Sequence, residues 1–147
     1  MAVGLTLQTE DIAEFKKEFH KIISDAKKTG ENQVVYIDKQ IEQKDLAKEV
    51  VERIQLLEPF GEDNNVPIFI YKDIKIDSIR TLSEGKHLKL TLIDDGYIIN
   101  AIGFNIGNLA DEYLVGDKVD LLGQLEINSF NGIDSVQINL KDMRKTC

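Results

Sequence analysis

Two lysines and a histidine stand in the most regular alternating stretch of the sequence, residues 86–92. Successive residues of a strand point to opposite faces, so this stretch predicts one face made of leucines and another made of His87, Lys89 and Thr91. Lys86 stands at the edge of the preceding loop. Because the leucine face is expected to turn inward, the cationic side chains would face outward, where they suit contact with phosphate.

A second set of contacts is expected from residues 97–105, although their pattern leaves the orientation of the strand open. One face would hold Tyr97, Ile99 and Ala101, and the other would hold Ile98, Asn100, Ile102 and Phe104. If the second face points outward, Ile102 and Phe104 offer a platform on which bases can stack. If it points inward, Phe104 belongs to the core, which is the more usual place for a phenylalanine among isoleucines.

The stretch Asn128-Ser129-Phe130-Asn131-Gly132 is a third candidate contact, because it carries an aromatic ring between the amide side chains of Asn128 and Asn131. A phenylalanine at a loop tip can stack on a base, or it can fold back over the strands that the loop joins. The residue types leave both alternatives open.

The sequence offers little for other kinds of chemistry. Its two histidines, His20 and His87, stand far apart, and its single cysteine, Cys147, is the last residue. We therefore predict neither a disulfide within the chain nor a metal site. No nucleophile with a neighbouring base and no pair of carboxylates stands out, so we assign no catalytic residue.

Five strand-like segments follow residue 67, with one short helical interruption at about 106–113. The strands are expected at 68–82, 87–93, 97–105, 118–127 and 133–142. Asp94-Asp95-Gly96 and Asn131-Gly132 are typical of tight hairpin turns. Three strands, a short helix and two strands is the order of the OB-fold, a five-stranded barrel that binds single-stranded nucleic acid across its second and third strands.

The first part of the chain is expected to mix strands and helices. Strands are predicted at 3–7 and 34–38, and helices are predicted from about 10 to 28 and from 43 to 57. The fold class is therefore α+β, with an α/β segment at residues 1–57 and an OB-fold barrel at residues 58–147. His20 is expected on the polar side of the first helix.

The stretch from Leu57 to Phe69 joins the two parts. Pro59 disfavours a helical conformation at Glu58, so the preceding helix should end there. Gly61 and the run of Asp63, Asn64 and Asn65 suit a turn.

This joining stretch resembles the Leu-Glu-Pro-Phe-Gly-x-Gly-Asn-x-x-Pro-x-Phe signature of the RecJ family of single-strand-specific 5′-to-3′ DNA exonucleases. The matching residues are Leu57, Glu58, Pro59, Phe60, Gly61, Asn64, Pro67 and Phe69. The chain departs from the signature at Asp63, where the family usually has glycine, and at Asn65, where proline is common. Three further stretches are similar in order and spacing, namely residues 1–7, 85–90 and 128–132.

The resemblance implies that the chain is the end of a DHHA1 domain followed by the OB domain, without the DHH catalytic domain. The sequence contains no Asp-His-His and no Gly-Gly-His motif. In this family Mn²⁺ or Mg²⁺ ions activate water for phosphodiester hydrolysis. The resemblance thus implies a metal for the intact enzyme, no cofactor for this chain, and single-stranded DNA and the missing DHH domain as partners. The expected DNA contacts are Lys86, His87, Lys89, Phe104, Asn128, Phe130 and Asn131.

Charge and hydropathy limit this interpretation. The net charge is −8; residues 1–58 hold 9 basic and 12 acidic residues, and residues 59–147 hold 9 basic and 14 acidic residues. Neither part is basic, so any DNA-binding surface must be a local patch. No apolar segment approaches the roughly 20 residues of a membrane-spanning helix, and no signal peptide is evident, so a cytoplasmic protein is expected.

The acidic balance also motivates an alternative function. The barrel would then be an architectural or protein-interaction module with little DNA affinity of its own. Charge reversal at Lys86 and Lys89 separates the two hypotheses, because it should weaken DNA binding only under the first.

Overall fold

The computed structural model describes residues 11–12, 14–19 and 34–146. The chain divides into two compact units, residues 1–35 and residues 36–147. In the first unit residues 14–19 are helical, as predicted, and the rings of Phe15 and Phe19 stack with their centroids 5.5 Å apart. The strand predicted at 3–7, His20 and Cys147 lie outside the described residues.

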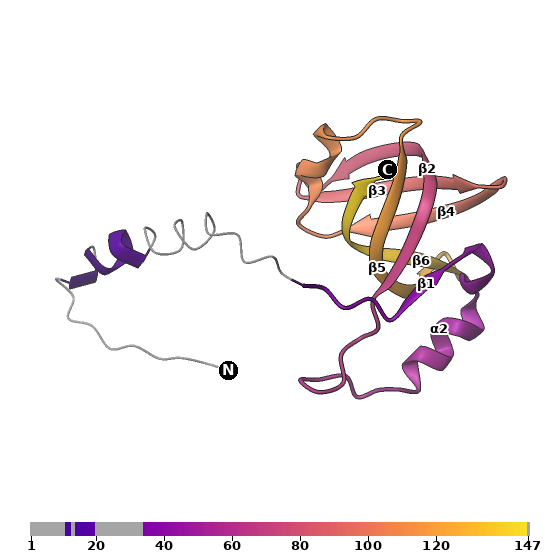
Figure 1. Cartoon of the computed structure of the whole chain (residues 1–147), viewed down its shortest axis with the longest axis horizontal. Coiled ribbons are helices and arrows are strands. Elements are labelled where there is room, and N and C mark those ends of the chain that lie inside the picture. The colour runs from indigo at the N-terminus through magenta and orange to yellow at the C-terminus, as the bar shows by residue number, and fades with distance from the viewer. Residues whose placement is uncertain (1–10, 13, 20–33, 147) are drawn as a thin grey trace. The chain divides into compact units, whose positions relative to one another are not determined.

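The second unit contains a closed five-stranded barrel, which confirms the predicted OB-like fold (Figure 1). Its strands are β2 (Phe69–Leu82), β3 (His87–Asp94), β4 (Tyr97–Gly103), β5 (Lys118–Phe130) and β6 (Ile133–Lys145). Neighbouring strands pair in the order β2-β3-β4-β6-β5, and a further pairing of β5 with β2 closes the barrel. The β4–β6 pair is parallel and the other barrel pairs are antiparallel.

The alternating leucines of β3 form the centre of the barrel core. Leu88, Leu90 and Leu92 have no exposed surface, as the sequence pattern predicted. Each other barrel strand contributes its own inward row, including Ile74 and Ile76 from β2 and Val119 and Leu121 from β5. Each such side chain contributes about 1.5–3 kcal/mol when it leaves water, so the period-two pattern fixes which face of each strand points outward.

Both predicted hairpin turns are present. Asp95 and Gly96 join β3 to β4 with φ angles of 44° and 86°, and Asn131 and Gly132 join β5 to β6 with φ angles of 51° and 76°. Positive φ at both central residues is the geometry of a type I′ turn, which aspartate, asparagine and glycine tolerate best. The turns therefore set the strand register that brings the outward residues together.

The helix in the connection between β4 and β5 is shorter than the one predicted at about 106–113. The connection contains only η3, a 3₁₀-helix at Gly107–Asp111. A Cβ atom on Gly107 would lie 2.0 Å from the carbonyl oxygen of Gly85, so this end of the barrel closes through a backbone contact that only glycine permits.

The residues before the barrel differ from two predictions. Residues 34–38 do not form the predicted strand; the strand is β1 (Lys39–Ile41), which pairs in parallel with β2. The helix predicted at 43–57 is divided into η2 (Gln43–Asp45) and the shorter α2 (Lys48–Gln55). Only these segments bury apolar side chains against the barrel, at Ile41 and Val51, and tertiary packing therefore decided the boundaries. The expected domain boundary between residues 57 and 58 lies inside the second unit.

The joining stretch after α2 is held by one asparagine side chain. Asn64 Nδ2 donates to the carbonyl oxygens of Leu57 and Pro59, at 2.7 Å and 3.1 Å. The backbones of Gly61 and Asn64 also bond to each other in both directions. The helix ends before Pro59 as predicted, and Phe69 is buried, whereas Leu57 is exposed.

Within the described part of the chain, no helix is long and apolar enough to cross a membrane.

Candidate nucleic-acid interface

The structure shows which face of β4 points outward, a question that the sequence left open. Ile99 and Ala101 are buried in the barrel, so Asn100, Ile102 and Phe104 point outward. Phe104 is 49% exposed, and the more usual expectation of a core phenylalanine is therefore wrong. It lies just after β4, beyond the last inward position of the strand, where the chain turns toward η3.

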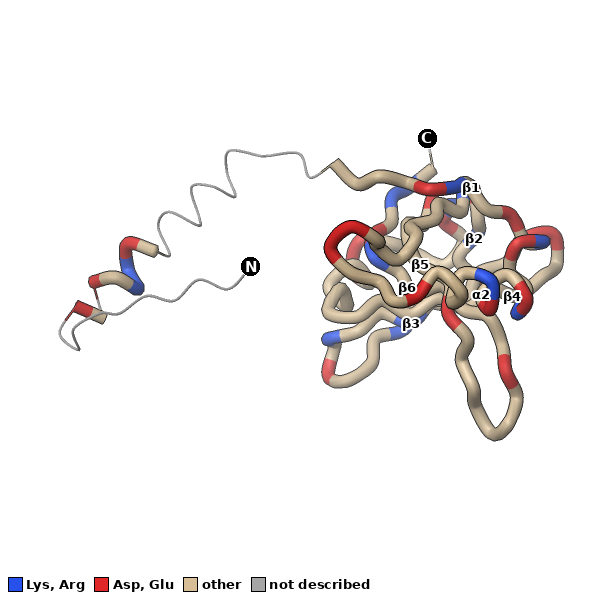
Figure 2. The backbone as a smooth tube through the Cα atoms, turned by 90° about the horizontal axis from the view of Figure 1, so that it is seen from below, with Lys and Arg blue, Asp and Glu red and all other residues tan. Residues whose placement is uncertain are grey.

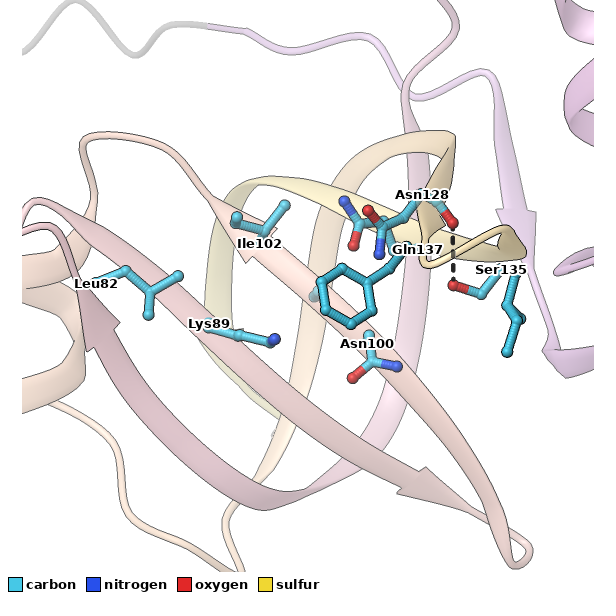
Figure 3. A pocket seen from close by; sticks show the side chains of 10 residues that line it. Leu82, Lys89, Asn100, Ile102, Asn128, Ser135 and Gln137 are labelled. Carbon is cyan, nitrogen blue, oxygen red and sulfur yellow. Dashed lines mark hydrogen bonds between the residues drawn. The ribbon is translucent and has the colours of Figure 1, made fainter.

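A groove with a volume of about 500 Å³ runs between this hairpin and the β5–β6 hairpin. It is lined by Leu82, Lys89, Asn100, Ala101, Ile102, Asn128, Phe130, Ile133, Ser135 and Gln137. In Figure 3 the side chains of Lys89, Asn100 and Gln137 lie around the same space, although they come from three different strands. The groove thus combines one cation, apolar surfaces and several amides, and this combination suits a phosphate and a base.

Three of the predicted contacts line the groove, namely Lys89, Asn128 and Phe130. Phe130 is 71% exposed, so its ring projects from the end of β5 and does not fold back into the barrel core. Asn131 sits in the turn beyond it and is not a lining residue.

The remaining predicted contacts form a second group further along the same outward face. The rings of His87 and Phe104 meet edge to face with their centroids 5.3 Å apart. The backbone N–H of Asn105 donates to His87 Nδ1 at 3.1 Å and holds the imidazole in place. Lys86 is exposed in the turn before β3. The seven residues therefore fall into the groove, this aromatic group and the two turns.

Arg80 is a neighbouring cation that the sequence reasoning missed. It pairs in register with Lys89 across β2 and β3, and both side chains are exposed. Neither forms an ion pair with any residue in the described ranges. Like charges placed directly opposite each other destabilise a sheet, so an anion between them would relieve the repulsion. Counting back from Lys89 through the turn at 83–86 could have identified Arg80.

The β5–β6 hairpin that carries Phe130 is fixed at its base. Asp134 accepts hydrogen bonds from Lys48 Nζ of α2 and from Ser129 Oγ, both at 2.5 Å. These hydrogen bonds, that from Lys48 first, lower the pKa of Asp134 below its ordinary value. α2 thereby anchors one wall of the groove.

Charge elsewhere on the barrel is mixed. Figure 2 shows basic and acidic positions interspersed along the backbone. Six lysine and arginine side chains of the described residues pair with carboxylates, for example Lys118 with Asp73 and Lys145 with Asp117. The unpaired cations Lys89, which lines the groove, and Arg80, its register partner on β2, therefore form a local basic patch on an acidic protein.

The described residues contain no group of three or more His, Cys, Asp or Glu side chains that could hold a metal ion. The described residues therefore do not fit the ligand set of a divalent metal centre.

Comparison with known proteins places these features in a family. The RecJ OB domain family matches residues 37–142. The single-stranded-DNA-specific exonuclease RecJ of Bacillus subtilis is 27% identical over 145 residues, which make up 97% of this chain and 18% of that protein. The protein of the same name from Haemophilus influenzae is 30% identical over 142 residues, covering 94% of this chain and 24% of that protein.

A solved structure shares the fold. The crystal structure of RecJ in complex with Mn²⁺ from Thermus thermophilus superimposes with a TM-score of 0.63 at 24% identity, over 97% of this chain and 20% of that one. The chain thus spans between 18% and 24% of the length of these relatives.

Proposed function

Because the chain belongs to the RecJ OB domain family, we propose that it is the part of a longer exonuclease that binds single-stranded DNA and guides it to an active site elsewhere. The chain corresponds to a minor part of relatives that are named single-stranded-DNA-specific exonucleases. The catalytic step would therefore belong to the remainder of the protein.

The groove between the two hairpins is the observation that carries this proposal. Lys89 and its neighbour Arg80 would contact phosphates, and the exposed ring of Phe130 would stack on a base. The amides of Asn100 and Asn128 would contact base edges or sugars. Positive side chains that contact the DNA backbone, combined with aromatic rings that stack on any base, are typical of single-strand binding.

The DNA strand would continue from the groove toward the aromatic group. Lys89 of β3 pairs in register with Ile102 of β4. Two residues further on, His87 begins β3 and Phe104 follows the end of β4, and their rings are in contact. Phe104 would offer a second stacking surface, and Lys86 would contact the phosphate beyond it. Asn131, at the turn next to Phe130, would contact the strand at its other end.

The intact protein would supply what this chain lacks. We assign the residues before the RecJ OB domain match, 1–36, to the end of a DHHA1 domain. We expect an adjoining DHH domain to hold Mn²⁺ or Mg²⁺, because RecJ of Thermus thermophilus has been solved in complex with each of these ions. The bound metal would activate water for phosphodiester hydrolysis. The matched relatives are bacterial, so we propose that the intact protein acts on DNA in the cytoplasm.

Replacing Phe130 by alanine is expected to weaken the binding of single-stranded DNA about tenfold, since one stacked base contributes about 1–3 kcal/mol. Folding stability should barely change, because the ring is 71% exposed. Fluorescence anisotropy of a labelled single-stranded oligonucleotide at low salt measures the effect.

Two further variants control this experiment. Phe130→Leu keeps an apolar wall without a flat ring and should lose nearly as much affinity as Phe130→Ala. Tyr97→Ala removes another exposed aromatic ring, one that does not line the groove, and should bind normally. Equal affinities of Phe130→Ala and the unmodified chain would argue against base stacking at this position.

The chain alone is expected to leave DNA intact, because it holds no Asp-His-His or Gly-Gly-His motif. Incubation of a labelled oligonucleotide with the purified chain and Mn²⁺, followed by gel electrophoresis, tests this. Degradation that co-purifies with the chain through successive columns would refute the assignment of catalysis to another domain.

The net charge of −8 favours a second candidate, an architectural module that fixes domain geometry and binds little DNA. The same anisotropy titration separates the two candidates. Binding that prefers single strands over duplex and fades with salt supports DNA guidance. Absence of binding at low salt supports the architectural role.

A further inference from the structure

Gln137 is one of the residues that line the groove. It lies on β6 between Asn100 of β4 and Glu126 of β5, and it is in register with both. Its side chain lines the groove, as Figure 3 shows, whereas Glu126 is not a lining residue. A base that entered the groove would therefore meet the Gln137 amide.

The carboxylate of Glu126 fixes the direction of that amide. Glu126 Oε1 accepts a hydrogen bond from Gln137 Nε2 at 2.5 Å, and Glu126 Oε2 accepts one from Asn139 Nδ2 at 3.0 Å. A carboxylate can only accept, so both amides must turn their NH₂ groups toward it and their oxygens away.

Asn139 shows how strong this constraint is. Its Oδ1 atom is buried and has no hydrogen-bond partner among the described residues. Burying an unpaired carbonyl oxygen is unfavourable, yet the opposite rotamer would place that oxygen against the carboxylate and bury an unpaired NH₂ group. The hydrogen bond from Asn139 to Glu126 therefore outweighs the cost of leaving Oδ1 of Asn139 unpaired. The same carboxylate orients Gln137.

The consequence is a fixed hydrogen-bond acceptor in the groove. With its NH₂ group held on the β5 side, Gln137 must turn Oε1 away from Glu126. An exocyclic amino group, as in cytosine or adenine, can donate to this oxygen. Uracil and thymine carry a carbonyl oxygen where cytosine carries its amino group, so a base in the same position would place that oxygen against both Oε1 and the negative charge behind it. Their N3–H could donate to Oε1 only if the base shifted from the position that cytosine occupies.

We infer that Gln137, oriented by Glu126, makes the groove select bases that carry an exocyclic amino group over uracil and thymine. This inference rests on the proposed function, because it assigns a base preference to the same single-strand site. Glu126 acts only as a positioning residue.

Two oligonucleotides of equal length, one all deoxycytidine and one all deoxyuridine, form the matched probe, since the bases differ only in the group at position 4 and in the proton on N3. We expect anisotropy titrations of the intact chain at neutral pH to give about three- to tenfold tighter binding of the deoxycytidine strand, the effect of one hydrogen bond. Gln137→Met, which keeps the side-chain length without polar atoms, should bind both strands equally.

Glu126→Gln tests the positioning role separately. Its amide can donate as well as accept, so it no longer dictates which way Gln137 turns. We expect the preference to fall toward unity while both strands bind more tightly, because one negative charge leaves the site. Glu62→Gln removes the same charge from an exposed loop outside the groove and should leave the preference unchanged.

The outcomes separate the two claims. Binding of both strands with affinities within about twofold of each other overturns the base preference and leaves the proposed function standing. A preference that survives in Gln137→Met also overturns the assignment to this residue. Failure of both strands to bind overturns the proposed function, and the inference with it.

Discussion

A chain that carries both Arg80→Glu and Lys89→Glu is expected to bind single-stranded DNA about 100-fold more weakly at low salt. Each cation can gain about 1 kcal/mol from a nearby phosphate in water, and reversal turns that gain into a similar loss. After screening by salt, the two charge reversals should cost close to 2.7 kcal/mol of binding free energy, which corresponds to about 100-fold in affinity.

The salt dependence of this variant is as informative as its affinity. Loss of two phosphate contacts should reduce the slope of log K against log salt by about 1.4. Anisotropy titrations at several salt concentrations measure affinity and slope together.

A matched variant separates local contact from net charge. Arg53→Glu with Lys72→Glu makes the same change in net charge at two exposed positions outside the groove. Neither residue forms an ion pair with the described part of the chain, so the structure should be preserved. If both double variants lose affinity equally, DNA responds to the overall charge and the groove is not its binding site.

The sequence predicted the barrel well because its signals are local. Alternation in β3 identified the buried Leu88, Leu90 and Leu92 and hence the outward Lys89. Asp95-Gly96 and Asn131-Gly132 identified the two hairpins, since few residue pairs tolerate that turn. Strand faces and turns together placed Lys89 and Phe130 on exposed surfaces.

The parts that the sequence could not settle depend on contacts between distant segments. Phe104 stands among isoleucines in the sequence, which is typical of a core residue. It lies one residue after the end of β4, however, and is exposed. Residues 34–38 have strong β propensity, yet the partner edge of β2 is occupied by Lys39–Ile41. Arg80 is the exception, because the turn at 83–86 sets the β2–β3 register that pairs it with Lys89.

Asp120→Ala is expected to destabilise the second unit by about 2–3 kcal/mol, because it removes the only charged side chain buried among the described residues. The Asp120 carboxylate accepts hydrogen bonds from the backbone N–H of Asp73 and from the side chains of Arg144 and Thr146, at 3.0–3.2 Å. Truncation leaves the Asp73 N–H without that partner, while the exposed guanidinium of Arg144 returns to water and limits the cost. Urea unfolding followed by circular dichroism measures the change.

The pH dependence identifies the cause of this loss. Burial tends to raise the pKa of Asp120, but hydrogen bonds from the Asp73 backbone, Arg144 and Thr146 outweigh it and hold the pKa below the ordinary 3.8. A carboxyl whose pKa is lower in the folded state stabilises the fold above its unfolded pKa, and this contribution disappears as pH falls through the folded value. The stability difference between the unmodified chain and Asp120→Ala should therefore be constant near neutral pH and shrink below pH 3.8. Asp77→Ala, at an exposed position of β2, serves as the control and should leave the free energy of unfolding at neutral pH close to that of the unmodified chain. A loss for Asp120→Ala that stays constant down to about pH 3 would mean that packing, and not the buried charge, accounts for it.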